Sequence, residues 1–254
     1  MIKLKTPAEI EILRVGGQKL AGILAALKEL VRPGVTTAFL NDQACSLIAA
    51  AGAEPSFLNY RPAGSRLAYP AALCVSLNEE IVHGIPSPRV LQMGELVTLD
   101  LGIKYQGLYT DAAITVPVGQ VSKEAQKLIN LTVEALAAGI AAAQPGARLG
   151  DIGAAVEAVA RRAGLGVVTD LAGHGVGYAV HEDPYVPNYG RPGTGESIKP
   201  GLVIAIEPMF TLGRPETKLE PDGFTFSTAD RSLSCHFEHT VAITENGPEI
   251  LTEL

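Results

Sequence analysis

The sequence predicts an α/β (α+β) protein built from two pseudo-symmetric halves. Pro33-Gly34 and Pro145-Gly146 are separated by 112 residues, and the same interval separates Gly52 from Gly164. Each of these landmarks ends a predicted helix, so two helix pairs repeat along the chain. Each pair is followed by β-rich sequence that contains two acidic candidate site residues. An internal duplication accounts for this pattern.

We therefore expect one domain over residues 1–254, with halves at roughly 1–118 and 119–254. The first half begins with the capping box Thr6-Pro7-Ala8-Glu9, which predicts a helix that runs to about Val31. A second helix is expected from about Thr37 to near Gly52, because its apolar residues recur on one face.

The second half repeats this arrangement. Ser122 can cap a helix that runs to about Ala143, and a further helix is expected around Ile152, Val156 and Val159. A cleft at the junction between two such halves is a usual place for a binding site.

The stretch ELVTLDLGIKYQGLYTDAAITV has two apolar β-branched runs around a polar turn, which predicts a β-hairpin. A turn centred between Tyr105 and Gln106 would place Asp100 directly opposite Asp111. Cross-strand partners lie about 4.5–5.5 Å apart at Cβ. Two carboxylates at that separation repel each other unless a proton or a cation lies between them. A pair of divalent cations bridged by carboxylates satisfies this cluster, so the hairpin indicates hydrolytic chemistry.

Three further metal-ligand candidates lie in the second half. His174 is flanked by glycines in GHGVG, and glycines allow close approach of the backbone. Glu207 is the only charge in the apolar strand LVIAIEPMF, and Glu238 lies in the predicted strand CHFEHTVAI. An ionised carboxylate in a buried strand is costly unless it is paired or bound to a metal. Pro208 places Glu207 at a strand end.

Each candidate also has a simpler interpretation. An Asp in a hairpin is often solvated, and a Glu in an apolar strand often faces water at an edge. His83 could be a loop histidine bonded to backbone, and His181 could cap the strand before Asp183. At least one of the two histidines that flank Glu238, His236 and His239, is expected to face packing or solvent. The conjunction of all these residues in a few segments favours a metal site.

Composition narrows the class of protein. The net charge of −7 and the pI near 5.3 provide no basic surface for nucleic acid or an anionic membrane. Charges, Pro or Gly interrupt every long apolar stretch, and the N-terminus lacks the features of a signal peptide. The three cysteines form no CxxC motif, which indicates reduced thiols in a cytoplasmic protein.

Five long segments resemble the type I methionine aminopeptidases, and the resemblance covers nearly the whole chain. They are SLNEEIVHGIP, LDLGIKYQGLYTDAAIT, GHGVGYAVHEDP, IAIEPMF and RSLSCHFEHTVAITENGPEILT. The resemblance implies a pita-bread fold, in which two α/β halves with antiparallel sheets surround a central dinuclear metal cleft. It also implies an enzyme that removes the initiator methionine from nascent proteins and peptides by attack of a metal-activated water. The short His181–Glu207 interval and the absence of a Cys/His-rich extension are similar to the bacterial form.

The resemblance further implies roles for individual residues. Two divalent ions (Co, Mn, Fe or Zn) would be held by Asp100, Asp111, His174, Glu207 and Glu238. Asp111 and Glu238 would bridge both ions, Asp100 would complete one site, and His174 with Glu207 would complete the other.

The resemblance also implies the groups that contact the substrate. His83 and His181 would contact it and stabilise the developing charge, and Glu207 would also move a proton. Tyr69, Phe57 and Phe224 would line the methionine pocket.

The pocket departs from the pattern expected for this family. The segment between Ser56 and Tyr69 looks several residues longer, and Phe57 stands where a cysteine often occurs. Val180 and Phe224 replace larger aromatic residues. We therefore hypothesise an enzyme that prefers N-terminal Met but accepts some other unbranched side chains.

The expected partners are N-terminal Met peptides and nascent chains, with transient ribosome contact and no direct binding of nucleic acid or membrane. We expect a monomer. Two alternatives stay open: a prolidase or Pro-directed aminopeptidase, which looks longer than 254 residues, and a metal-free binding protein on the same fold.

Overall fold

The computed structural model describes residues 1–61 and 67–253. Its helices are α1 (Pro7–Leu30), α2 (Thr37–Ala50), α3 (Lys123–Ala142) and α4 (Leu149–Ala163). The strands of the first half are β1 (Glu54–Pro55), β2 (Leu73–Leu77), β3 (Glu80–Val82), β4 (Leu96–Tyr105) and β5 (Leu108–Pro117). Those of the second half are β6 (Gly166–Val167), β7 (Gly173–Gly175), β8 (Glu182–Val186), β9 (Val203–Ile206), β10 (Met209–Thr211), β11 (Thr217–Leu219), β12 (Phe226–Thr228), β13 (Ser234–His236), β14 (Glu238–Thr244) and β15 (Gly247–Ile250).

The helix boundaries follow from capping residues visible in the sequence. The Thr6 hydroxyl accepts a bond from Glu9 N, and the Glu9 carboxylate accepts one from Thr6 N at 2.7 Å, which completes the predicted capping box. Ser122 caps α3 through Ala125 N. Gly164 ends α4 with a φ of +70°, a conformation that favours glycine. The four predicted helices are confirmed to within two or three residues at their ends.

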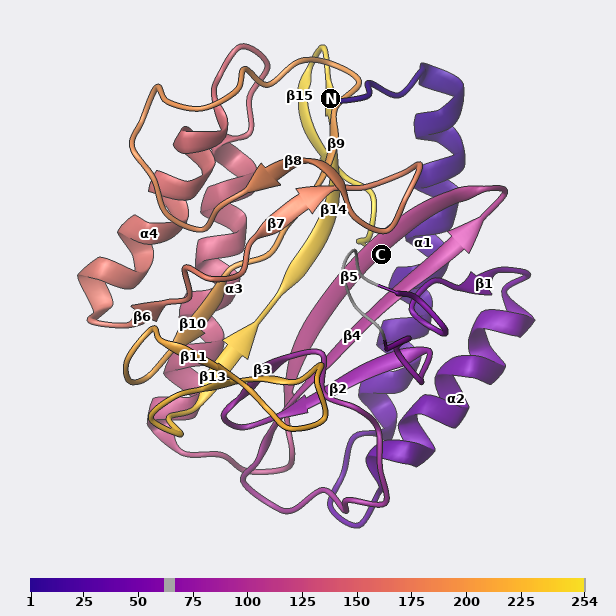
Figure 1. Cartoon of the computed structure of the whole chain (residues 1–254), viewed down its shortest axis with the longest axis vertical. Helices are drawn as coiled ribbons and strands as arrows, with labels where there is room; N and C mark the ends of the chain where they lie inside the picture. Colours follow the sequence, from indigo (N-terminus) through magenta and orange to yellow (C-terminus); the bar gives the residue numbers. More distant parts are fainter. Residues whose placement is uncertain (62–66, 254) are drawn as a thin grey trace.

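One antiparallel sheet connects the two halves in the order β1-β4-β5-β14-β9-β7-β8, with β2 also on β4 and β15 also on β14. Helices α1 and α2 pack on the strands of the first half, and α3 and α4 pack on those of the second (Figure 1). Two small three-stranded sheets, β13-β10-β6 and β11-β12-β3, complete the lower part of the molecule. The mixed α/β class with two similar halves is the one that the sequence predicts.

The predicted hairpin is β4–β5, but the expected direct opposition of Asp100 and Asp111 is wrong. Asp100 pairs with Ala113, and Asp111 pairs with Gly102. The turn is Gln106-Gly107, and both residues have positive φ, 48° and 88°, as a type I′ turn requires. This turn lies one residue later than the predicted centre. The two aspartates are therefore diagonal neighbours on one face of the sheet instead of direct partners.

Within the main sheet, the two halves join at a very short stretch of pairing between β5 and β14. Only Glu238↔Ala113 and His239↔Ala112 pair there. The Thr240 hydroxyl adds two bonds, accepting from Asp111 N at 2.9 Å and donating to Asp111 O at 2.7 Å. This connection in the sheet therefore passes directly beside three candidate ligands, which are Asp100, Asp111 and Glu238.

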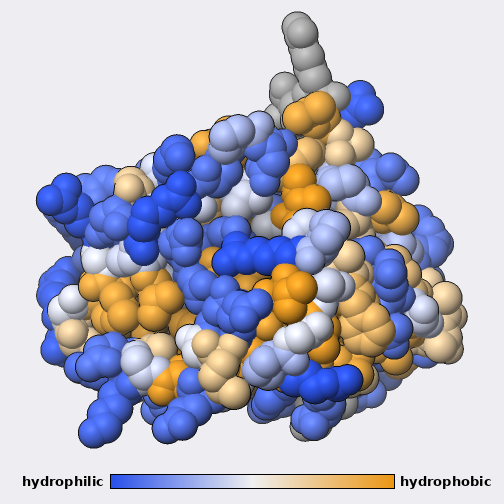
Figure 2. All heavy atoms as spheres, turned by 90° about the horizontal axis from the view of Figure 1, so that it is seen from below, coloured by the Kyte–Doolittle hydropathy of each residue, from blue (hydrophilic) through white to orange (hydrophobic). Residues whose placement is uncertain are grey.

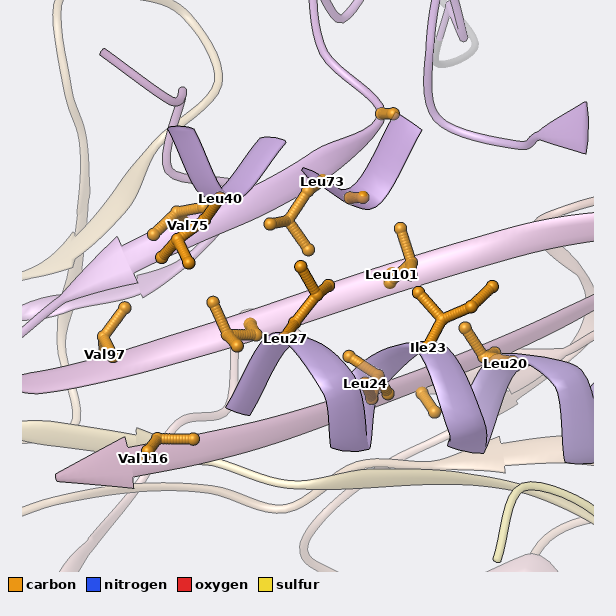
Figure 3. Packing of buried hydrophobic residues seen from close by; sticks show 14 of the residues in the cluster. Leu20, Ile23, Leu24, Leu27, Leu40, Leu73, Val75, Val97, Leu101 and Val116 are labelled. Carbon is orange, nitrogen blue, oxygen red and sulfur yellow. The ribbon is translucent and has the colours of Figure 1, made fainter. Parts of the chain in front are cut away.

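The core of the first half lies between α1, α2 and the sheet (Figure 3). Leu20, Ile23, Leu24 and Leu27 recur at helical spacing along α1 and face apolar side chains of β2 and β4. Each such fully buried side chain stabilises the fold by about 1.5–3 kcal/mol relative to exposure. A rigid core behind the sheet holds the front face of β4 and β5 in place.

On the face in Figure 2, hydrophobic residues form separate groups between hydrophilic ones. Within residues 1–61 and 67–253, no helix has the length and apolarity needed to cross a bilayer. Cys45, Cys74 and Cys235 are free thiols, as predicted.

Candidate metal centre and substrate cleft

The carboxylates of the first half come from the hairpin. Asp100 on β4 and Asp111 on β5 project from the same face, because Asp100 pairs with Ala113 and Asp111 lies two residues before it. Both side chains are buried, with 6% and 4% exposure. Strand register alone therefore places two acids side by side out of water.

The carboxylates of the second half extend this row across the sheet. Glu238 also pairs with Ala113, so it projects from the same face as Asp100. Glu207 follows β9 directly, and the β9–β14 register continued by one residue places it opposite Glu238. The predicted strand-end position of Glu207 is thus observed.

His174 completes the cluster from β7, at a register irregularity between His174 and Gly175. Its Nδ1 lies 3.0 Å from the carbonyl of Gly175, which fixes the proton on Nδ1 and leaves Nε2 as an acceptor. Nε2 lies 3.5 Å from Glu207 Oε1 and 4.0 Å from Glu238 Oε1. One potential ligand atom each from Asp111, His174 and Glu238 lie within 4.8 Å of one another. These distances bring four of the predicted ligands together, and strand register and the shared cavity place Asp100 beside them.

The electrostatics of this cluster are unfavourable without a cation. Burial, followed by the charge of Asp111, holds the pKa of Asp100 well above its usual range, and burial raises the pKa of Asp111 to about 7. Burial and neighbouring carboxylates likewise raise the pKa values of Glu207 and Glu238. Burial lowers the pKa of His174 to about 3, so its imidazole is neutral.

Unpartnered oxygens indicate what the cluster fits. Asp100 Oδ1, Asp111 Oδ1 and Glu238 Oε1 are buried without a hydrogen-bond partner. In the described part of the chain, none of the four carboxylates forms an ion pair with Lys or Arg. Buried acids in this state require protons or metal ions. Carboxylates with one neutral imidazole suit divalent Mn, Fe, Co and Zn, so these residues fit the predicted metals.

The cluster forms one wall of a cavity of about 250 Å³. The cavity is lined by Phe57, Tyr60, Tyr69, Cys74, Val82, His83, Asp100, Asp111, Leu171, Ala172, Gly173, His174, His181, Tyr185, Glu207, Met209, Phe224 and Glu238. All the residues predicted to act in catalysis, metal binding or substrate binding are on this list. A cleft with a charged wall and an apolar, aromatic end suits a substrate that has one apolar side chain beside the reacting bond.

The apolar end consists of the predicted pocket residues. Tyr69 and Phe224 meet edge to face with centroids 5.4 Å apart, and the Tyr69 hydroxyl donates to Gly84 O at 2.8 Å. Phe57 is buried beside Gly102, where any Cβ would lie 2.9 Å from the phenylalanine ring. Val180 belongs to the same apolar cluster. The predicted lengthening of this segment includes residues 62–66, which lie outside the described residues.

Two further histidines line the cleft where the sequence predicts them. His83 follows β3 with a φ of +62°, an uncommon conformation for a non-glycine residue that often marks a functional site. Burial, and then His181, lowers the pKa of His83 to about 4. The ring of His181 lies 4.4 Å from that of His174. Both imidazoles are neutral groups that can donate one hydrogen bond.

Sequence analysis did not select three residues of the site. Tyr60 lines the cavity, and its hydroxyl lies 2.8 Å from His181 Nδ1. Cys74 is a buried wall residue whose pKa is raised by burial, so it stays a thiol. His236 is buried with Nε2 3.5 Å from Glu207 Oε2. The alternation His236-Phe237-Glu238 could have indicated that His236 shares a face with Glu238. His239 instead bonds to Thr252 Oγ1 through Nδ1.

The loop that bears His181 is supported by the N-terminal segment. The buried Lys5 ammonium forms an ion pair with Glu182, and Glu182 also accepts a bond from Tyr178 N at 3.1 Å. The Lys5 stem passes so close to Gly177 that a Cβ there would lie 2.4 Å from Lys5 Cε. Lys5 N donates to Gly201 O at 2.7 Å. A residue near the start of the chain thus fills the interior of a loop beside the cleft.

Comparisons with known proteins agree with this geometry. The profile of metallopeptidase family M24 matches residues 11–245. The chain is 46% identical to a methionine aminopeptidase of Treponema pallidum, over all of this chain and 97% of that protein. It is 42% identical to methionine aminopeptidase 1 of Bacillus subtilis, over the whole of both. The structure of a Thermotoga maritima methionine aminopeptidase matches all of both chains with a TM-score of 0.95 and 40% identity. A prolidase of Pyrococcus furiosus shares the fold, with a TM-score of 0.78, 24% identity and 65% of that chain covered.

Proposed function

Because this chain belongs to the methionine aminopeptidases of metallopeptidase family M24, we propose that it removes the N-terminal methionine from peptides and nascent proteins with two divalent metal ions. The observation that supports the metal-dependent part is the row of buried, unpartnered carboxylate oxygens beside the acceptor nitrogen of His174. Asp100, Asp111, His174, Glu207 and Glu238 are the proposed ligands.

The ions, when bound, supply an activated water at neutral pH and polarise the scissile carbonyl. The residues of this chain do the rest. The aromatic end formed by Phe57, Tyr69 and Phe224 binds the methionine side chain and excludes water from it. The Glu207 carboxylate takes the proton of the attacking water and returns it to the departing amine.

The neutral imidazoles of His83 and His181 complete the site. Each can offer one N–H to the carbonyl oxygen that becomes negative, and a buried donor of this kind is more effective than one in water. Burial lowers the pKa values of both histidines, which keeps them neutral over the physiological range. The resting state therefore adds no positive charge that would repel the free α-amine or the metals.

The test is hydrolysis of Met-Ala-Ser by protein stripped with a chelator, before and after addition of Co²⁺ or Mn²⁺. We expect free methionine only when metal is present. N-acetyl-Met-Ala-Ser is the matched substrate control, and it should stay intact because its amine is blocked.

The outcomes separate the parts of the proposal. Cleavage by the fully stripped protein would contradict metal dependence. If calorimetry shows two metals bound per chain but the peptide is not cleaved, the proposed metal site stands and the proposed substrate is contradicted. Neither cleavage nor metal binding would favour a binding protein on this fold.

Breadth of specificity is a separate part of the proposal. We expect preference for Met with measurable cleavage of peptides that begin with norleucine, because Phe57 and Val180 reshape the apolar end. A panel of X-Ala-Ser peptides on which only Met is cleaved would reject this. A Phe57→Cys variant should shift the ratio of kcat/KM values between Met and norleucine by up to about tenfold.

The cellular setting is also proposed. The enzyme is proposed to be a cytoplasmic monomer, and the free cysteines support the cytoplasmic setting. Transient contact with ribosomes follows from nascent chains as the proposed substrate, because the acidic charge supplies no surface for ribosomal RNA. Sedimentation analysis of the purified protein, and ribosome pelleting at low and physiological salt, test these two points.

A further inference from the structure

We propose that Tyr60 is a positioning residue that sets which nitrogen of His181 has the proton: its hydroxyl donates to Nδ1, so that Nε2–H becomes the hydrogen-bond donor of His181. The inference rests on the proposed role of His181 in the cleft. It concerns the neutral imidazole alone, since burial lowers the pKa of His181.

The contact itself is specific. The Tyr60 hydroxyl lies 2.8 Å from His181 Nδ1, a distance typical of a good hydrogen bond. The two rings lie 5.3 Å apart at an angle of 55°. Tyr60 therefore touches His181 through both its ring and its hydroxyl, and the two contacts can be removed separately.

The hydroxyl is the donor of this bond for two reasons. A phenol oxygen shares electron density with its ring, so it is a better donor than acceptor, whereas an imidazole sp² nitrogen is a strong acceptor. Burial, followed by the charge of Asp111, raises the pKa of Tyr60, so the phenol keeps its proton. If Nδ1 donated instead, the phenol proton would have no acceptor among the protein atoms of residues 1–61 and 67–253, where this hydroxyl makes no other bond.

The backbone around Tyr60 fixes the position of this hydroxyl. Tyr60 N donates to Phe57 O, and Tyr60 O accepts from Tyr69 N, both at 2.8 Å. Asn59 N donates to Tyr69 O, also at 2.8 Å. Phe57, Tyr69 and the orienting hydroxyl thus belong to one bonded unit of the first half, which reaches across to an imidazole of the second half.

The consequence is chemical. A neutral imidazole has one N–H, and its other ring nitrogen is a hydrogen-bond acceptor. With Nδ1 occupied as acceptor, Nε2 must be the donor and can stabilise a developing oxyanion. Without the hydroxyl, His181 can also adopt the Nδ1–H form, in which Nε2 presents a lone pair to that oxyanion.

The first experiment uses Tyr60→Phe, which keeps the ring contact and removes the hydroxyl. Loss of one oxyanion donor costs about 10²-fold in kcat or more, and partial exchange of the tautomer should cost about tenfold. We expect kcat on Met-Ala-Ser to fall by about tenfold with KM changed less than twofold. A residue that only shapes the pocket would raise KM instead.

The second readout does not depend on turnover. In Zn²⁺-loaded protein with ¹⁵N-labelled histidine, the ring nitrogens of His181 should report the Nε2–H form, and Tyr60→Phe should convert them to a mixture. The signals are assigned by their loss in His181→Gln. Tyr69→Phe is the matched control, because the Tyr69 hydroxyl donates to Gly84 O and its removal should leave the His181 nitrogens unchanged.

A double-mutant cycle decides whether Tyr60 acts through His181. In the His181→Gln background, Tyr60→Phe should have no further effect on kcat. A tenfold loss that persists there would overturn the inference, as would unchanged His181 nitrogens in Tyr60→Phe. A changed tautomer with unchanged kcat would support the positioning and contradict the catalytic role of His181 in the proposed function.

Discussion

The two halves of the molecule supply the site by different routes. The first half provides Asp100 and Asp111 from adjacent strands joined by the two-residue turn Gln106-Gly107. The second half provides His174, Glu207 and Glu238 from three strands that are distant in sequence. Local register is enough to place the first pair, whereas the second set depends on sheet assembly over a long stretch of chain.

The chemistry is divided in the same way. Two of the three aromatic residues of the apolar end, Phe57 and Tyr69, and two carboxylates belong to the first half, and four of the five histidines belong to the second. Neither half has a complete site, and the narrow β5–β14 pairing brings them into register. Both halves therefore contribute to the apolar end, whereas most of the histidines come from the second half.

The largest effect is expected from a substitution in the metal centre, to which both halves contribute. Asp111→Asn keeps the size of the side chain but removes the charge of a proposed ligand beside the β5–β14 pairing. We expect kcat to fall by about 10³-fold, because metal ions supply several kcal/mol of charge stabilisation. Titration calorimetry should show fewer than two tight metal sites. Asp42→Asn, at an exposed position of α2, is the control, and activity within threefold of wild type for Asp111→Asn would contradict the assignment.

A smaller loss should follow from an imidazole of the second half. His181→Gln should lower kcat by about 10²-fold while metal binding is retained, since His181 offers a donor and not a ligand. His239→Gln is the matched control, because His239 bonds to Thr252 and lines no part of the cavity. It should cost about 1 kcal/mol of stability with kcat within twofold. Equal activity losses in both variants would contradict a specific role for His181.

Substitution of one glycine in each half tests how tightly the backbone around the site is packed. A Cβ at Gly102 would lie 2.2 Å from the Ser56 hydroxyl and 2.9 Å from the Phe57 ring, which are both side-chain atoms that can move. One at Gly173 would lie 2.3 Å from the backbone oxygen of Ala205. We expect Gly102→Ala to cost about 1 kcal/mol and Gly173→Ala about 3 kcal/mol. Urea unfolding measures both. Gly22→Ala in α1, where a Cβ has open space, should stabilise the protein by up to about 1 kcal/mol. The reverse order for the two site glycines would contradict the comparison.

The smallest effect concerns pH in metal-stripped protein. Burial raises the pKa of Asp111 from 3.8 to about 7, so this carboxyl binds more protons in the folded state than in the unfolded state between those values. The buried neutral histidines have the opposite effect on stability, and comparison with stripped Asp111→Asn protein cancels it. The Tm of stripped wild type should therefore fall relative to that of stripped Asp111→Asn as pH rises from about 4 to 7, by about 2–4 °C for each kcal/mol lost. Added Mn²⁺ should raise Tm most at the upper end of this window, because the metal needs deprotonated ligands. A Tm of stripped wild type that rises relative to that of stripped Asp111→Asn from pH 5 to 7 would contradict this assignment.

Much of the fold was predictable because its determinants are local. The Thr6 capping box, the Ser122 cap and the Gly164 terminator set helix ends through bonds within one turn. The hairpin was predicted, but its turn was not placed correctly. A shift of the turn by one residue moves the cross-strand partner of each residue by two positions. Such a shift leaves every side chain on its own face of the sheet, so alternation of polarity cannot reveal it.

The remaining parts of the site depend on contacts that no local pattern encodes. Tyr60 lies in an irregular segment, and its meeting with His181 is set by the assembly of the two halves. The alternation His236-Phe237-Glu238 indicates that His236 shares a face with Glu238. Only the structure shows that His236 lies beside Glu207. The ligand set was recognisable because isolated charges in apolar strands are costly and therefore stand out.

The buried Lys5 links the time at which this protein becomes active to the order in which it is made. Its partner Glu182 lies 177 residues further along the chain, and Glu238 comes later still. A ribosome that has released only the first half therefore presents an N-terminal segment whose ammonium has no carboxylate to meet. The ion pair that supports the loop of His181 can form only after residue 182 has been synthesised. Because the proposed ligand Glu238 is synthesised later still, we expect no partly translated form with a working cleft, and activity should appear in a single late step.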